Sequence, residues 1–477
     1  MRTFRTAISV ALILIIGVSA LSWGTTTEDI EGIWMGTLNV SSIELRIIFT
    51  ITRNADGTLS ATMDSPDQEA ENIAISKVTF LQGRLYLESK VVQGTYEGHL
   101  RRDGSIEGKW QQGGISLPLE LKRTDEIPKL HRPQEPKKPY PYIEEEVIYE
   151  NGKAGIKLAG TLTLPNSEGP FPAVMLITGS GAQDRNETVF GHRPFLVLAN
   201  YLTRRGIAVL RVDDRGVGGS NGNLSQATIE DLADDVLIGV KYLKSRKEIN
   251  PKKIGLIGHS EGGDIAPIAA SRSSDVAFIV LMAGTGVTVD EFMYLQSDLL
   301  LKAAGASEKV LALQRTSSKQ IFEILKQEND NAIAKKKIRK IMADFLTKLS
   351  KEEKETLGVS EGTMEIQLKA ILSPWFRFFL TYDPKSTLMK VKCPVLAING
   401  ELDLQVSSKE NLSAIEEALK AGGNTNYTIQ ELPKHNHMFQ RAQTGTISEY
   451  MKIEETISPI ALNVISQWIL KQTIRAN

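Results

Sequence analysis

A short segment near the middle of the chain places the strongest constraint on its fold. Residues 254–257 form an apolar run typical of a buried strand, and residues 265–269 have the composition of a helix. Between them residues 258–262 read Gly-His-Ser-Glu-Gly, a Gly-x-Ser-x-Gly motif centred on Ser260. A serine on so sharp a turn takes strained backbone angles, and the two glycines remove side chains that would collide with the strand and the helix. The segment predicts a serine hydroxyl exposed above a strand end, although an ordinary helix N-cap serine is the simpler alternative.

The chain around this motif alternates strand-like and helical segments from about residue 144 onward. Near-continuous apolar strands separated by helices are typical of a parallel sheet with both faces covered. About 100 residues between Gly284 and Pro394 have no strand pattern and include amphipathic, lysine-rich stretches. We therefore predict an α/β domain over residues 144–477, with a helical cap inserted at about 288–385. The strand-like runs are 173–178, 207–212, 254–257, 277–282 and 395–399.

The first part of the chain differs from this domain. Arg2 and Arg5 precede a short apolar run, which predicts a secretory signal peptide over residues 1–24 and an exported protein; an uncleaved membrane anchor is the alternative. Residues 28–124 alternate apolar and polar side chains between turn signals, which predicts a small antiparallel β-domain, a sandwich or a barrel. Five of the 18 prolines lie between residues 128 and 141, so we interpret residues 125–143 as an extended linker.

Composition and motif searches exclude several classes of function. Lysine and arginine number 56 against 57 acidic residues, so no basic excess favours nucleic acid. The single cysteine, Cys393, excludes an intramolecular disulfide and a multi-cysteine metal site, and we interpret it as a buried apolar residue. The glycine-rich segment 214–220 lacks the Gly-x-Gly-x-x-Gly spacing of a dinucleotide loop, and no His-x-x-x-His pattern occurs. We expect no cofactor, no metal and no nucleic-acid partner.

A reactive serine needs an imidazole base and an acid that orients it. Of the six histidines, His435 and His437 lie in a loop after the strand-like residues 427–432. Asp403 follows the apolar strand 394–400, at the strand end where catalytic groups of open α/β sheets gather. We therefore predict Ser260, Asp403 and His437 as nucleophile, acid and base, with Glu401 as a fallback for the acid.

These motifs together resemble the α/β-hydrolase superfamily, specifically bacterial esterase-type members with an N-terminal β-domain. The matching segments include residues 178–185, 214–220, the serine motif and Asn436-His437-Met438-Phe439. The resemblance favours His437 over His435 as the base. It also implies an oxyanion hole formed by the backbone amides of Ser180 and Glu261, since the residue after the nucleophile and a loop after an earlier strand supply these donors.

The predicted function is hydrolysis of carboxylic esters with short-to-medium acyl chains through an acyl-serine intermediate. The same intermediate serves peptide and thioester cleavage, so an exported peptidase acting on short peptides and an acyl thioesterase remain alternatives, with a non-enzymatic binding protein less favoured. The aromatic segment 373–379 lines an acyl pocket or forms the cap core. We expect a small-molecule ester or short peptide as the binding partner, and no stable membrane insertion after leader removal.

Overall fold

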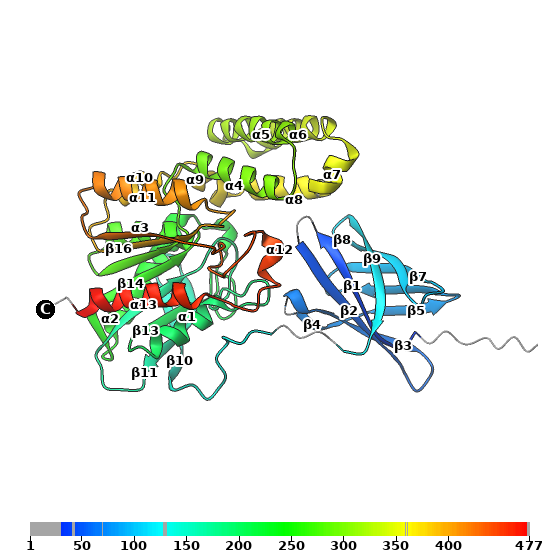
Figure 1. The fold of residues 1–477 in the computed structure, drawn as a ribbon, viewed down its shortest axis with the longest axis horizontal. Helices are drawn as coiled ribbons and strands as arrows, with labels where there is room; N and C mark the ends of the chain where they lie inside the picture. Colours follow the sequence, from blue (N-terminus) through cyan, green and yellow to red (C-terminus); the bar gives the residue numbers. More distant parts are fainter. Residues whose placement is uncertain are drawn as a thin grey trace, which may run out of the picture.

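The computed structural model describes residues 30–40, 43–68, 70–126, 131–357, 359 and 361–474. The predicted signal peptide lies outside these residues, as do residues 127–130 of the predicted linker. The described chain forms an N-terminal β-domain beside a larger α/β domain, with a layer of helices above the latter (Figure 1). This is the fold class that the sequence predicts, and the prediction is confirmed. Among the described residues, no helix has the length and apolarity needed to cross a bilayer.

The N-terminal domain is one nine-stranded sheet in which every neighbouring pair is antiparallel, in the order β4-β3-β2-β1-β9-β8-β7-β6-β5. The sheet curls, so that Phe49 of β2 packs against Tyr96 of β7 and Trp110 of β8, at 5.7 and 6.1 Å between ring centroids. Trp34 and Trp110 are both buried in this core, as expected for strand-anchoring aromatic residues. The strands are β1 Gly32–Val40, β2 Ile43–Arg53, β3 Leu59–Ser65, β4 Ala70–Ala74, β5 Lys77–Leu81, β6 Arg84–Ser89, β7 Gly94–Leu100, β8 Ile106–Gln112 and β9 Ile115–Thr124.

The second sheet has eight strands in the order β10-β11-β13-β12-β14-β15-β16-β17. At one edge of the sheet β11 pairs antiparallel with both β10 and β13. The remaining neighbours, from β13 and β12 through β14, β15 and β16 to β17, are parallel. Parallel pairing brings the carboxyl ends of β12, β14, β16 and β17 to one edge of the sheet, where the loops that follow them can meet. The strands are β10 Tyr142–Asn151, β11 Ile156–Pro165, β12 Phe171–Ile177, β13 Ala208–Val212, β14 Ile249–His259, β15 Phe278–Met282, β16 Val395–Gly400 and β17 Tyr427–Leu432.

Helices cover both faces of this sheet because its strands are apolar on both sides. Within β12, Val174 and Leu176 face the core formed with α1 and α13, whereas Met175 and Ile177 face the core formed with α2, α3 and α11. The covering helices are α1 Pro194–Thr203, α2 Ile229–Ser245, α3 Gly262–Arg272, α10 Pro384–Leu388, α11 Ser408–Ala421 and α13 Pro459–Ile474.

The cap is inserted between β15 and β16, and its helices lie above the sheet with α5 and α6 outermost (Figure 1). Its core joins the sheet core through the buried side chains of Phe322, Phe376 and Phe379. The cap helices are α4 Val289–Ala303, α5 Glu308–Gln327, α6 Asn331–Thr347, α7 Lys351–Leu357, α8 Glu361–Ile371 and α9 Pro374–Phe379.

The described part of the linker docks on the α/β domain. The Arg132 guanidinium donates to four backbone carbonyls of the α/β domain, at 2.9 Å to Gly191, 3.2 Å to Phe190, 2.9 Å to Met451 and 3.1 Å to Ile453. One of these loops follows β12 and the other follows the short helix α12 Ile447–Tyr450. The linker therefore holds together the loop after β12 and the loop after α12.

Candidate active site

The serine elbow has the geometry that its glycines allow. β14 ends at His259, Ser260 has a φ of 53°, and α3 begins at Gly262. A Cβ on Gly258 would lie 1.9 Å from the carbonyl oxygen of Gly262, and one on Gly262 would lie 2.2 Å from that of Ile177. Only glycine fits at either position, because both obstacles are backbone atoms. The close packing of strand, turn and helix holds Ser260 in its left-handed conformation and offsets the strain.

Asp403 and His437 meet at the carboxyl edge of the sheet. Asp403 follows β16, His437 follows β17, and the Oδ2 atom of Asp403 lies 2.8 Å from Nδ1 of His437. Both side chains are buried, and the other Asp403 oxygen accepts the backbone N–H groups of Gln405 and Val406 at 2.8 Å each. A carboxylate fixed in this way holds the proton on Nδ1 of His437 and leaves Nε2 as a free base.

The alternative acid and the alternative base do not form such a pair. Glu401 accepts the backbone N–H of Lys434 at 2.8 Å. His435 bonds through Nδ1 to the carbonyl oxygen of Pro433 at 2.7 Å, and its buried Nε2 has no hydrogen-bond partner among the described residues. Beside the elbow lies the ring of His437, whose centroid is 4.8 Å from that of His259, the residue before Ser260.

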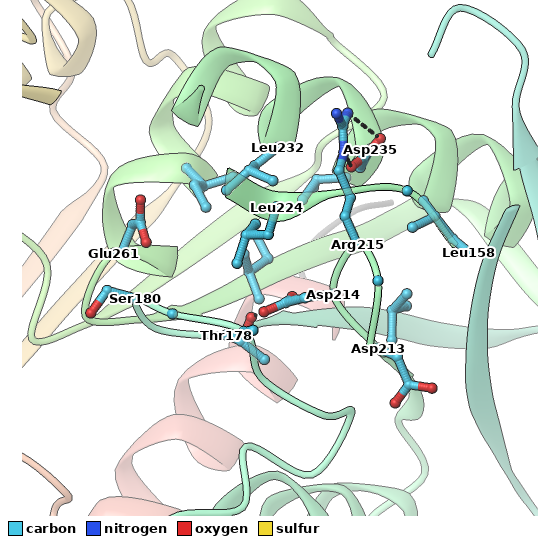
Figure 2. A pocket seen from close by; sticks show the side chains of 18 of the residues that line it. Leu158, Thr178, Ser180, Asp213, Asp214, Arg215, Leu224, Leu232, Asp235 and Glu261 are labelled. Carbon is cyan, nitrogen blue, oxygen red and sulfur yellow. Dashed lines mark hydrogen bonds and ion pairs between the residues drawn. The ribbon is translucent and has the colours of Figure 1, made fainter. Parts of the chain in front are cut away.

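The loop after β12 approaches the elbow from the other side. A Cβ on Gly179 would lie 3.3 Å from the Cβ of Ser260, so the backbone of this loop is close to the serine. The amide of Gly179 is engaged, because it donates to Oε1 of Glu187 at 2.7 Å. In the described part of the chain, the amides of Ser180 and Glu261 donate to no protein acceptor. Both residues line the cavity shown in Figure 2.

This cavity has a volume of about 690 Å³ and extends from Ser180 and Glu261 toward α2. Its walls are largely apolar, and Figure 2 shows Leu224 and Leu232 facing its centre. The cation at its far end is neutralised, since Arg215 Nε lies 2.6 Å from Asp235 Oδ2. Apolar wall residues come from β11, β12, β13, α2, α3 and the segment after β13: Leu158, Met175, Leu176, Ile177, Val212, Leu224, Leu232, Val236 and Ile265.

Two carboxyl groups, that of the buried Glu261 and that of the partly buried Asp214, face the cavity without a cationic partner among the described residues. Burial raises the pKa of Glu261 to about 7, against the hydrogen bond from Trp375 and with the help of the nearby Asp214. Burial likewise raises the pKa of Asp214 to about 7, although Gln183 N–H and Thr178 Oγ1–H both donate to it at 2.9 Å. Burial therefore favours the neutral form of both carboxyl groups.

The aromatic segment 373–379 divides between the cavity wall and the cap core. Trp375 lines the cavity, and its indole N–H donates to Oε1 of Glu261. Phe376 and Phe379 instead point into the cap core, where Phe379 packs edge-on against Phe292 at 6.2 Å between ring centroids. The cap thus supplies one wall of the cavity and fixes the side chain next to the nucleophile position.

Two residues near the elbow have a place in the site that the sequence did not reveal. No sequence pattern assigns either of them a role, because His259 is the variable residue before Ser260 in the serine motif and Glu187 carries no motif of its own. In the structure Glu187 Oε1 lies 2.9 Å from His259 Nδ1, below the loop of Gly179. The sequence offered one signal for this pair. A histidine next to the nucleophile is buried at the end of a strand, so its ring nitrogens need buried hydrogen-bond partners.

The charged side chains of the described residues serve structural contacts near the cavity. Within them, no group of three or more His, Cys, Asp or Glu side chains converges as metal ligands would. Arg185, at the cavity loop, pairs with Asp213 at 2.7 Å and also with Glu146, while Asp184 accepts hydrogen bonds from Asn186 and Thr188. Asp184 and Arg185 therefore stabilise the conformation of this loop and its contacts with neighbouring strands.

The strand order, the elbow after β14 and the acid–imidazole pair after β16 and β17 define the α/β-hydrolase class, and the protein is a serine hydrolase, carboxylesterase-like in fold and sequence. The family model described as X-Pro dipeptidyl-peptidase (S15 family) matches residues 154–435, and the chain belongs to this family.

Individual proteins are also similar to this chain. The chain is 26% identical over 386 residues to Esterase EstD from Thermotoga maritima, covering 80% of this chain and 82% of that protein. It is 32% identical over 125 residues to the uncharacterized protein YfhR of Escherichia coli K12, covering 26% of this chain and 41% of YfhR. Among solved structures, Est1E from Butyrivibrio proteoclasticus with bound ferulic acid has a TM-score of 0.41 and 16% identity, covering 69% of this chain and all of that one.

Proposed function

We propose that the protein hydrolyses carboxylic esters of short-to-medium acyl chains, with Ser260 as nucleophile, His437 as general base and Asp403 as orienting acid. The observation that carries this proposal is the buried 2.8 Å hydrogen bond between Asp403 and His437, beside an elbow that holds Ser260 in a left-handed conformation. The relationship to Esterase EstD supports the choice of an ester as substrate.

The proposed reaction gives each of these three residues one task. The Ser260 hydroxyl attacks the ester carbonyl and passes its proton to Nε2 of His437, while Asp403 stabilises the imidazolium through Nδ1. The carbonyl oxygen becomes an oxyanion, which accepts hydrogen bonds from the amides of Ser180 and Glu261. His437 then protonates the leaving alkoxide, and the alcohol departs. A water molecule, deprotonated by His437, attacks the acyl-serine; the carboxylic acid leaves and the proton returns to Ser260.

The cavity supports the proposed range of acyl chains. It opens beside Ser180 and Glu261, where the acyl carbon of the intermediate would sit, and its volume of about 690 Å³ falls within the range of small-molecule sites. Each methylene group that enters its apolar walls contributes about 0.8 kcal/mol of binding. We therefore expect kcat/KM to rise along a chain-length series and then to fall once the acyl group exceeds the cavity.

The decisive experiment compares the wild-type protein with Ser260→Ala on p-nitrophenyl esters from acetate to palmitate. We expect the wild type to prefer the short and medium esters, and S260A to lose about 10⁴-fold or more in kcat. Ser245→Ala is the matched control, because this serine is exposed at the end of α2 and bonds only its own helix. Retained turnover in S260A, with S245A equally active, would refute the assignment of the nucleophile.

A specific observation favours a peptidase as the second candidate. Glu261 and Asp214 place two carboxyl groups in the cavity without a cationic partner in the described chain, and a peptide's amino-terminal ammonium would suit them. The family model, named for an X-Pro dipeptidyl-peptidase, points the same way. Turnover of aminoacyl p-nitroanilides at least one hundredfold above that of p-nitrophenyl esters would replace the esterase proposal by this one. A thioesterase is less favoured, since an exported enzyme meets little acyl-CoA.

We also propose that the protein is exported. The support is the charged start, short apolar run and small residues of the first 24 positions. Expression of the full chain in a Gram-negative host, followed by fractionation and mass spectrometry of the mature N-terminus, tests it. Full-length protein that stays in the cytoplasmic fraction would contradict export.

A further inference from the structure

A second buried acid–imidazole pair lies against the proposed triad. Glu187, in the loop between β12 and α1, and His259, the last residue of β14, have only 3% and 6% of their surface exposed. Glu187 Oε1 lies 2.9 Å from Nδ1 of His259, and Nε2 of His259 lies 3.0 Å from the backbone oxygen of His437. One imidazole thus connects the loop after β12 to the loop after β17, and its own backbone leads into Ser260.

The carboxylate of this pair also holds the loop after β12, which carries the Ser180 amide. The oxygen of Glu187 that contacts His259 accepts the Gly179 N–H at 2.7 Å as well. A Cβ on Gly179 would lie 3.3 Å from this oxygen and 3.3 Å from the Cβ of Ser260, so the loop is held tightly between them. The next amide along the chain, that of Ser180, is thereby kept at a set distance from the serine.

The hydrogen-bond pattern determines the protonation of the pair. The backbone oxygen of His437 can only accept, and Glu187 Oε1 already accepts from Gly179, so both ring nitrogens of His259 meet acceptors. An imidazole satisfies two acceptors only when both nitrogens carry hydrogen, which is the imidazolium form. Burial by itself would lower the pKa of His259, but the charge and hydrogen bond of Glu187 and the His437 carbonyl outweigh burial and raise it.

We propose that Glu187 and His259 are positioning residues of the hydrolase reaction: they form a buried ion pair that holds the Ser180 amide, Ser260 and His437 in one geometry. This inference rests on the proposed function. The three groups come from three separate segments, and the pair contacts all three segments. Misplacement of a reacting group by about 1 Å can cost about one hundredfold in rate, so a device that fixes their spacing has a large effect on kcat.

A purely structural role is the competing explanation, because loss of one partner from any buried ion pair destabilises a fold. The two roles differ in their kinetic signature. A positioning role lowers kcat at an unchanged KM in protein that is fully folded, whereas a structural role lowers the amount of folded protein and leaves its kcat intact.

The test uses Glu187→Ala, Glu187→Gln, His259→Phe and the double variant E187A/H259F, assayed with p-nitrophenyl butyrate and checked by circular dichroism and thermal unfolding. E187A and H259F should each lower kcat by about thirtyfold to one hundredfold with KM within about twofold. The double variant should be no worse than either single one, since both break the same connection. E187Q should keep most activity, because its amide oxygen can accept from Gly179 and from Nδ1–H of His259 in the place of Glu187 Oε1.

Asp67→Ala is the matched control, since Asp67 is a buried carboxylate that pairs with Arg46 in the β-domain. It should lower stability without changing kcat. Unchanged kcat in folded E187A and H259F, or activity lost only in proportion to folded protein, would overturn the positioning role. If instead the wild type hydrolyses no activated ester, or S260A is as active as the wild type, the proposed function itself fails.

Discussion

Trp375 of the cap donates its indole N–H to the carboxylate of Glu261, the residue that follows Ser260. This bond joins a helix that lies more than 100 positions later in the chain to the N-cap residue of α3, the helix after the elbow. The bond fixes the side chain of Glu261, whose pKa burial raises to about 7. This side chain lines the cavity, and the backbone amide of the same residue is a proposed oxyanion donor. The cap therefore helps to set the charge beside the reacting carbonyl.

Replacement of this acid should change the pH dependence of the reaction. Below pH 7 the Glu261 side chain is neutral, and above it a negative charge develops next to the oxyanion and disfavours it. Glu261→Gln keeps the acceptor for Trp375 and stays neutral. We expect the ratio of kcat/KM for E261Q over wild type on p-nitrophenyl butyrate to rise by about threefold to tenfold between pH 6 and pH 8.

The same variant discriminates between substrates. On an aminoacyl ester, whose ammonium group a carboxylate attracts, the ratio should fall over this pH range. Trp375→Phe serves as a comparison, because it removes the hydrogen bond to Glu261 and retains an aromatic wall. A ratio for E261Q that does not depend on pH with either substrate would show that Glu261 does not titrate beside the reacting group.

Replacement of the orienting acid should affect chemistry and not binding. Asp403→Asn keeps the size of the side chain, but it can place its amide N–H toward His437 and select the wrong imidazole tautomer. We expect kcat to fall by about 10⁴-fold while KM changes little. Glu401→Gln is the control, because Glu401 bonds the backbone of Lys434 and should leave kcat near the wild-type value. Equal losses in the two variants would contradict the choice of Asp403.

The elbow should tolerate no added atom. Gly258→Ala would place a Cβ 1.9 Å from the backbone oxygen of Gly262, so the strand and helix must separate. We expect destabilisation by about 3 kcal/mol or more, visible as insoluble protein or a much lower unfolding temperature. Gly152→Ala, with no atom near its Cβ position and no positive φ, should leave stability within about 0.5 kcal/mol. A soluble, normally stable G258A protein would contradict the packing described here.

The parts of the site that the sequence could predict are those set by local rules. The Gly-x-Ser-x-Gly spacing around Ser260 follows from backbone collisions within five residues, and Asp403 could be placed because it ends an apolar strand. Glu187 and Trp375 could not be found in this way. Their roles depend on contacts with His259 and Glu261 across 72 and 114 positions, and no local pattern fixes which loop or cap residue makes such a contact.

The fold shows the same division. Alternating residues predicted the antiparallel β-domain, because the period of two is a property of each strand, and apolar runs predicted the parallel sheet. The curl that brings Phe49 onto Tyr96 depends on the twist of all nine strands together. Docking of Arg132 on four carbonyl groups likewise depends on where two distant loops end, so the linker was predicted only as an extended segment.

A last prediction concerns stability, through Asp264 on the first turn of α3. Burial raises the pKa of this side chain to about 7, although Thr285 donates to it through its amide at 3.1 Å and its hydroxyl at 2.7 Å. In the unfolded chain Asp264 titrates near its ordinary value of 3.8, so between pH 4 and pH 7 the folded state binds more protons than the unfolded state. Its contribution to the free energy of unfolding is therefore complete below pH 4 and is lost as the pH rises through 7.

Asp264→Asn removes this titration and can still accept from Thr285. Whatever its effect at pH 5, the variant should gain about 2 kcal/mol relative to wild type when both are measured at pH 8, since one pH unit is worth about 1.4 kcal/mol. Urea unfolding of the α/β domain at the two pH values, followed by tryptophan fluorescence, measures the difference. Asp275→Asn, a half-exposed acid paired with Lys244, is the control and should show no such gain. An equal loss of stability with pH in D264N and wild type would mean that Asp264 is already ionised in the folded protein at pH 5.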